Sequence, residues 1–267
     1  MHRFAMCNEA FGDAPIGDVC RTLRGLGYSG IEIAPYTLGP SPDRREIRAA
    51  IQDEGMEFVG LHWLMVSPPG LHLTTSDDAL RRESWGHLRE LIDLSHHLAH
   101  DLAVAPSVMV LGSPRQRGTT PGTSRAQATE RLRDGLAELA PYAGDRHVTI
   151  LLEALPPDQC DVVQTLAEAA AIVHEINSPA IQTMFDTHNA VCEIEPHDVL
   201  IERFGDVIKH VHVNEMDGRH PGTGNYDFTA VLSALERIHY AGWISLEVFD
   251  FKPDPVTIAR ETIGRLL

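Results

Sequence analysis

Short apolar segments alternate with amphipathic segments about eight times along the chain, and this alternation restricts the fold more than any other feature. Most of the apolar segments are rich in Val, Ile, Leu or Phe and lie near Gly, Pro or Asp, which is typical of buried strands. They are RFAMCNE from Arg3, GIEIAP from Gly30, EFVGLHW from Glu57, VMVLGS from Val108, VTILLEA from Val148, IQTMFDTH from Ile181, VIKHVHVNE from Val207 and WISLEVFD from Trp243.

The segments between these strands carry apolar residues at helical spacing. IGDVCRTLRGLG, for example, places Val19, Leu23 and Leu26 on one face and ends at a glycine. The same pattern predicts helices over residues 16–27, 76–100, 124–143, 162–176, 228–242 and 255–267, and a less regular one over 196–205.

Repeated strand–helix alternation predicts a parallel sheet. Eight repeats in 267 residues most simply close into a (β/α)₈ barrel, with residues 1–267 forming a single domain. An open doubly wound sheet is the alternative, but CNEAFGDAP after the first strand is not the Gly-rich phosphate turn typical of that fold. The longest non-helical stretches, LMVSPPGLHLTTS and GSPRQRGTTPGT, follow the third and fourth strands, where we expect them to line a pocket.

Ionisable side chains stand near the C-terminal ends of the last four predicted strands, the end where barrels of this kind carry out chemistry. They are Glu153, Asp186, His212 and Glu247. No Lys or Arg lies at these strand tips, and buried carboxylates without a counter-charge are costly. A divalent cation would supply the missing charge, and three carboxylates with one imidazole suit Mn²⁺, Mg²⁺, Co²⁺ or Zn²⁺.

The seventh predicted strand carries two histidines on one face, because alternation puts His210 and His212 on the same side. We expect His212 to be the metal ligand. His210 lies one pleat deeper, where we expect it to support the site or to pack. The same alternation points Lys209 away from both histidines.

The segments LLEALPP, FDTHN, KHVHVNE and SLEVFDF, with GYSGIEIAP near the start, resemble the xylose isomerase-like TIM barrel family of sugar (phosphate) isomerases and epimerases over essentially the whole chain. That family includes the ketose 3-epimerases and the hydroxypyruvate isomerases. The resemblance implies one divalent metal ion, Mn²⁺ first among the candidates, held by Glu153, Asp186, His212 and Glu247. It also implies that Glu153 and Glu247 are the catalytic proton-transfer pair and that the protein forms a homodimer or homotetramer.

The chain departs from the 3-epimerase pattern at three places. Gln159 stands where those enzymes usually carry a further acid, and either His188 or Asn189 takes the place of a substrate-contacting histidine. Gly218 occupies the position of an arginine that contacts the sugar, with Arg219 beside it. These changes count against ordinary ketohexose epimerisation.

Several further residues are candidates for the substrate pocket. His62 and Trp63 end the third predicted strand, and an aromatic floor beside a polar group suits a sugar face. Arg115 and Arg117 could hold a carboxylate or phosphate, or they could belong to a solvated loop.

The resemblance implies a sugar epimerase or isomerase that removes a proton next to a carbonyl and forms an enediolate. The same proton removal would serve a lyase or dehydratase acting on a keto-sugar, a keto-inositol or a 3-keto-glycoside. A non-catalytic sugar- or metal-binding barrel would not need the two opposed glutamates. A distant resemblance to endonuclease IV would imply an abasic-site endonuclease, which uses a three-zinc cluster with more histidines, but the fourth strand ends without a His or an acid.

The charge balance limits the partners. With 22 Lys and Arg against 38 Asp and Glu, the net charge of −16 disfavours nucleic acid and anionic membranes, so a small carbohydrate is the expected partner. No apolar run is long enough to span a bilayer, and MHRFAMCNEAFGDAP does not read as a signal peptide. Four scattered cysteines favour a reduced, cytoplasmic protein over a disulfide framework.

Overall fold

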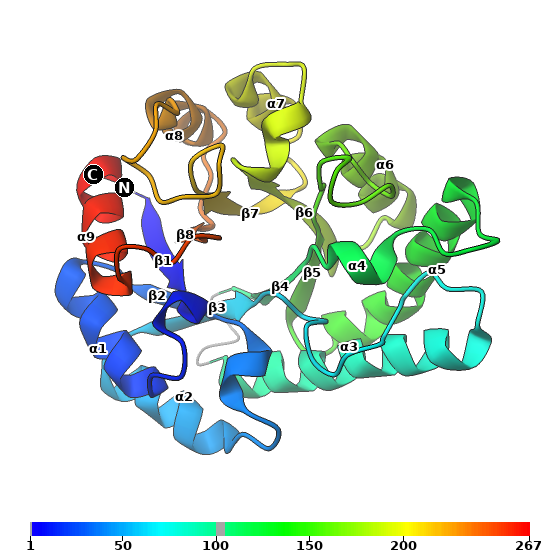
Figure 1. Ribbon diagram of the computed structural model, residues 1–267, viewed down its shortest axis with the longest axis horizontal. Coiled ribbons are helices and arrows are strands. Elements are labelled where there is room, and N and C mark those ends of the chain that lie inside the picture. Colours follow the sequence, from blue (N-terminus) through cyan, green and yellow to red (C-terminus); the bar gives the residue numbers. More distant parts are fainter. Residues whose placement is uncertain (1, 100–104) are drawn as a thin grey trace.

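The computed structural model describes residues 2–99 and 105–267. Eight parallel strands close into a barrel in the order of the chain, and helices surround it (Figure 1). The strands are β1 (Arg3–Cys7), β2 (Gly30–Ile33), β3 (Glu57–Leu61), β4 (Ser107–Leu111), β5 (Val148–Leu152), β6 (Ile181–Asp186), β7 (Ile208–Val213) and β8 (Trp243–Leu246). The predicted closed (β/α)₈ barrel is confirmed, and each strand begins within one residue of its predicted start.

The helices fill the outer layer. They are α1 (Ile16–Leu26), α2 (Arg44–Asp53), α3 (Asp78–Leu98), α4 (Pro114–Arg117), α5 (Arg125–Gly144), α6 (Leu166–Ile176), α7 (His197–Arg203), α8 (Phe228–Arg237) and α9 (Pro255–Leu266). The predicted helix over residues 76–100 ends at Leu98, and residue 100 lies outside the described residues. Helix α2 is not predicted from the sequence, because Ile51 is its one fully buried residue and the apolar stripe is therefore weak.

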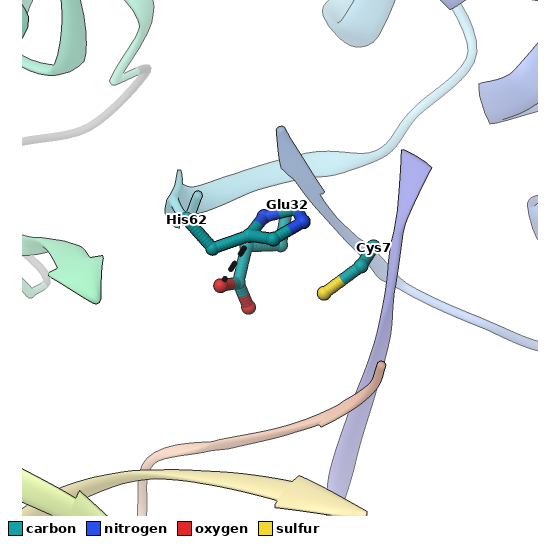
Figure 2. A group of neighbouring side chains, drawn as sticks. All are labelled: Cys7, Glu32 and His62. Carbon is teal, nitrogen blue, oxygen red and sulfur yellow. Dashed lines mark ion pairs between the residues drawn. The ribbon is translucent and has the colours of Figure 1, made fainter. Parts of the chain in front are cut away.

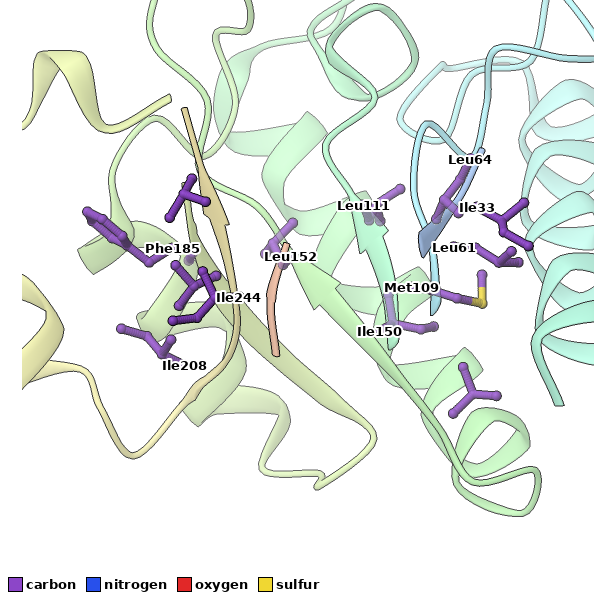
Figure 3. Packing of buried hydrophobic residues seen from close by; sticks show 14 of the residues in the cluster. Ile33, Leu61, Leu64, Met109, Leu111, Ile150, Leu152, Phe185, Ile208 and Ile244 are labelled. Carbon is purple, nitrogen blue, oxygen red and sulfur yellow. The ribbon is translucent and has the colours of Figure 1, made fainter. Parts of the chain in front are cut away.

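The two faces of the strands pack against different neighbours. Residues on the outer face belong to a large cluster with the helices (Figure 3). On the inner face, a small apolar cluster forms the floor of the barrel. Its members are Ala5, Val59, Val108, Val110, Leu151 and Met184. Alternation places Glu153 and Asp186 one pleat above Leu151 and Met184, so the interior turns from apolar to ionisable toward the C-terminal ends.

Strand register then sets neighbouring polar residues side by side. Asp186 on β6 is the direct partner of His212 on β7, and Val213 is the partner of Leu246, which Glu247 follows. Among the described helices, none combines the length and apolarity that crossing a membrane requires.

Gly60 allows β3 and β4 to approach closely. A Cβ atom added to Gly60 would lie 2.1 Å from the carbonyl oxygen of Val108. We expect Gly60→Ala to lower the free energy of unfolding by about 1–3 kcal/mol, because backbone cannot give way as a side chain can. Gly25→Ala on α1 is the control, since nothing lies within 4 Å of the added atom and alanine favours a helix. Urea unfolding of both variants checks this; a Gly60→Ala protein as stable as wild type would contradict the close contact.

Candidate metal centre

Four side chains from consecutive strands meet at the C-terminal mouth of the barrel. Glu153 follows β5, Asp186 ends β6, His212 lies in β7 and Glu247 follows β8. One ligand atom from each lies within 4.8 Å of the others, and all four residues are buried. The His212 Nδ1 atom lies 3.0 Å from Glu247 Oε2 and 3.7 Å from Asp186 Oδ2. The structure thus brings together the four residues that the sequence nominates as metal ligands.

The chemistry of this set fits a divalent cation. Asp186 Oδ2 is buried and has no hydrogen-bond partner, so it offers a free lone pair toward the centre. The other oxygen, Asp186 Oδ1, accepts hydrogen bonds from the backbone N–H groups of His188 and Asn189 at 2.7 and 2.9 Å. These bonds fix the carboxylate and leave Oδ2 free to bind a metal ion. The set of oxygen and imidazole donors suits Mn²⁺ and related ions.

Burial and mutual repulsion shift the pKa values of the acids when no cation is present. Burial, followed by the nearby Asp186 and Glu247 carboxylates, raises the pKa of Glu153 from 4.5 to about 8. Burial also raises the pKa of Glu247. Burial opposes the charged form of His212, but Glu32 and Glu247 raise its pKa well above the usual value. In the metal-free protein these side chains therefore hold protons that a bound cation would displace.

Hydrogen bonds orient the two glutamates. The Trp63 Nε1–H group donates to Glu247 Oε1 at 2.7 Å, and Asn189 Nδ2 donates to Glu153 Oε1 at 2.7 Å. Gln159 Nε2 in turn donates to Asn189 Oδ1 at 3.1 Å. Gln159 and Asn189 thus form a neutral amide chain that ends on Glu153.

A cavity of about 610 Å³ opens above the centre, and Glu153 and Glu247 both line it. Trp63 and Phe249 form one wall with stacked rings, 6.3 Å between centroids, and Tyr36 stacks behind Trp63. Arg115, Asn189 and Gln159 supply polar groups to the lining. A hollow of similar size, about 640 Å³, is lined by Glu215 and Tyr226 but by none of the four candidate ligands.

Three other residues nominated from the sequence, His62, His188 and Arg219, do not line this cavity. His62 is fully buried below the cavity, where its Nε2 atom lies 2.7 Å from Glu9 Oε2. His188 packs against Phe249, and its Nδ1–H donates to the Met216 carbonyl oxygen. Arg219 is paired with Asp217 and is absent from the cavity lining.

Two loop residues have structural roles. The buried guanidinium of Arg117 donates to the carbonyl oxygens of Gly112, Val162 and Glu153, so Arg117 is not available for an external anion. Glu215 accepts from the backbone N–H groups of Gly222 and Tyr226 and so braces the loop after β7.

Sequence reasoning missed the residues directly beneath the centre. Glu32 in β2 is fully buried and lies within hydrogen-bond distance of both His210 and His212. The signal that could have found it is an acid at an inward-facing position of the apolar strand GIEI, where a buried charge needs a partner.

Comparison with known proteins gives consistent matches. The model of the xylose isomerase-like TIM barrel family matches residues 20–267. L-ribulose 3-epimerase from Methylomonas sp. (strain DH-1) is 30% identical over a region that covers 84% of this chain and 74% of the relative's own length. Fructoselysine 3-epimerase from Shigella flexneri is 24% identical over 94% of this chain and 92% of its own. A solved L-ribulose 3-epimerase covers 99% of this chain and 93% of its own with a TM-score of 0.86 at 21% identity, which shows the fold.

The raised pKa of Glu153 predicts a pH-dependent effect of Glu153→Gln on the metal-free protein. The folded state favours the protonated carboxyl, so this contribution to stability is complete below pH 4.5 and is lost as the pH rises through about 8. The amide never ionises, so the variant should gain at least about 1 kcal/mol over wild type between pH 5 and pH 9. Urea unfolding in the presence of EDTA measures the difference. Exposed Glu83→Gln on α3 is the control, and a difference that does not vary with pH for Glu153→Gln would contradict the prediction.

Proposed function

We propose that this chain, which belongs to the xylose isomerase-like TIM barrel family, is a divalent-metal-dependent sugar epimerase or isomerase acting on a hydroxy-ketone. The observation that carries the proposal is that Glu153 and Glu247 line one cavity while sharing a centre with Asp186 and His212. The names of the relatives, L-ribulose 3-epimerase and fructoselysine 3-epimerase, support a keto-sugar as the substrate class.

The proposed metal ligands are Glu153, Asp186, His212 and Glu247, with Mn²⁺ the first choice and Mg²⁺, Co²⁺ or Zn²⁺ the alternatives. When bound, such an ion acts as a Lewis acid that polarises a carbonyl and stabilises the negative charge of an enediolate.

The two glutamates carry the protons. One removes the proton from the carbon next to the carbonyl, and the other returns a proton to the opposite face, which inverts that carbon. Return to the neighbouring carbon would instead interconvert an aldose and a ketose. Trp63 and Asn189 each hold Oε1 of one glutamate. This leaves Oε2 of each for proton transfer once an ion has displaced the contact between His212 Nδ1 and Glu247 Oε2. Loss of a substituent after the same first step would make the protein a lyase, and the product distinguishes these outcomes.

The cavity wall suggests how the sugar is held. Trp63 and Phe249 offer flat apolar faces to the C–H side of a sugar, and Asn189 and Gln159 offer amides to its hydroxyls. Arg115 lines the cavity without a hydrogen-bond or ion-pair partner among the described residues, and it suits a carboxylate or phosphate on the substrate.

The other nominated residues act less directly in this proposal. The His188 ring packs against the Phe249 ring of the cavity wall, and His62 lies beneath the cavity, where it contacts Glu9. Arg219 reaches substrate only if it leaves Asp217.

We also propose a cytoplasmic homodimer or homotetramer. Cys7, Cys20, Cys160 and Cys192 are all free, which agrees with a reducing compartment. Light scattering of the purified protein measures the assembly.

Deuterium exchange with solvent tests the activity. Protein loaded with Mn²⁺ is incubated in heavy water with neutral ketoses, hydroxypyruvate and 3-keto-glycosides, and NMR identifies the labelled carbon. We expect label next to the carbonyl, with a rate at least about 100-fold lower in Glu153→Gln and in Glu247→Gln. Glu83→Gln should exchange like wild type. Undiminished label in both active-site variants would contradict the two-glutamate mechanism.

Gly112 gives a second test that leaves both glutamates in place. A Cβ atom at Gly112 would lie 2.1 Å from Glu153 Oε2, which must then move away. We expect Gly112→Ala to fold normally, because a flexible carboxylate can shift, but to lose at least about tenfold in exchange rate. Circular dichroism and the exchange assay measure the two effects. Gly86→Ala on α3 has open space around it and serves as control; wild-type exchange by Gly112→Ala would show that the position of this carboxylate does not matter.

A further inference from the structure

The two ring nitrogens of His212 face opposite ways. Nδ1 points to the candidate metal centre, 3.0 Å from Glu247 Oε2. Nε2 points down into the barrel, 3.1 and 3.2 Å from the two carboxylate oxygens of Glu32. A carboxylate only accepts hydrogen bonds, so a proton on Nε2 satisfies this contact. Without an ion, Nδ1 faces the Glu247 carboxylate in the same way; an ion bound at Nδ1 takes the place of the proton there, while the Nε2–H group stays on Glu32.

Glu32 is itself held in place by other imidazoles. His210 Nε2 donates to Glu32 Oε2 at 2.8 Å, and His62 Nδ1 lies 3.6 Å from Glu32 Oε1. The far side of the His62 ring donates from Nε2 to Glu9 Oε2. Figure 2 shows the side chains of Cys7 in β1, Glu32 in β2 and His62, which directly follows β3, converging on one another. Glu32, His62 and His210 have no exposed surface, so none of them can swing aside into solvent.

We propose that Glu32 is a positioning residue that fixes the ring orientation and tautomer of His212 and so sets the metal affinity of the centre. The inference rests on the proposed metal-binding role of His212. It adds a residue that touches neither the ion nor the substrate. A carboxylate behind a metal-bound imidazole orients the ring and makes it a stronger donor, and loss of such a partner typically weakens metal binding about 10–100-fold.

Glutamine is the informative substitution at this position. His212 Nε2 contacts both carboxylate oxygens of Glu32, so the amide nitrogen of glutamine lies against the Nε2–H group of His212 whichever way the amide is turned. His212 can then rotate or move its proton to Nδ1, the atom the ion needs.

The experiment measures binding of Mn²⁺ alone by isothermal titration calorimetry, with no substrate present. We expect one ion per chain in wild type and an affinity about 10–100-fold lower in Glu32→Gln. The absorption spectrum of bound Co²⁺ should also change, because the imidazole donor is reoriented. Tyr28→Phe is the control for general destabilisation. It removes a buried hydroxyl that donates to the Ala259 carbonyl oxygen on α9, in the outer layer, and should leave Mn²⁺ affinity unchanged.

The outcomes separate this inference from the proposed function. A folded Glu32→Gln protein with wild-type Mn²⁺ affinity and Co²⁺ spectrum overturns the positioning role and leaves the metal centre intact. Two ions per chain in wild type and one in Glu32→Gln also overturn it, because Glu32 would then be a ligand of the second ion, as in the group it forms with Cys7 and His62. Absence of Mn²⁺ binding to wild type, or unchanged binding in His212→Asn, contradicts the metal centre itself.

A measurement on wild type covers the case in which Glu32→Gln does not fold. With ¹⁵N-labelled histidine and ¹¹³Cd²⁺ as the ion, we expect cadmium coupling at Nδ1 of His212 and a proton on Nε2. Cadmium on Nε2 would overturn the inference, because that atom would then not be donating to Glu32.

Discussion

Repulsion among three buried carboxylates governs the mouth of this barrel. Glu153, Asp186 and Glu247 lie within a few ångströms of one another with one imidazole between them, and no free cationic side chain of the described residues reaches the group. Arg117 is near, but its N–H groups are bound to backbone carbonyls. Burial, and after it the neighbouring Asp186 and Glu247 carboxylates, raises the pKa of Glu153 in the metal-free protein, so either protons or a cation must balance the charge. The proposed chemistry depends on this imbalance.

The interior of the barrel preserves this excess of negative charge at the mouth. An apolar floor that includes Val110, Leu151 and Met184 keeps water away from below, and a layer of paired acids and imidazoles lies above it. In this layer Glu32 faces three histidines, so each buried charge has a partner before the open centre is reached. The centre itself is left short of positive charge, and it is the part that opens to the cavity.

The strands and the four candidate ligands could be predicted because both depend on local patterns. A β-branched run indicates a strand, and an acid directly after it indicates the rim. Helix α2 escaped prediction because Ile51 alone is fully buried there. The contact between Glu32 and His212 could not be predicted either, because strand alternation indicates only that both side chains face inward. Which strands meet across the interior depends on barrel closure. The roles of His62 and Arg117 were likewise hidden, because each is decided by distant partners, Glu9 for one and the Val162 carbonyl oxygen for the other.

Arg117 has a consequence for how such a protein can diversify. Its guanidinium ties together the backbone at Gly112, Glu153 and Val162, and so anchors the segments that follow β4 and β5 from beneath. Residues 113–116 lie between Gly112 and this anchor and contribute to the cavity wall, but they make none of these three bonds. Substitutions in this short loop can alter what the cavity accepts while the proposed reacting groups stay in place. The barrel thus separates the proposed reaction centre from the loop that would select its substrate.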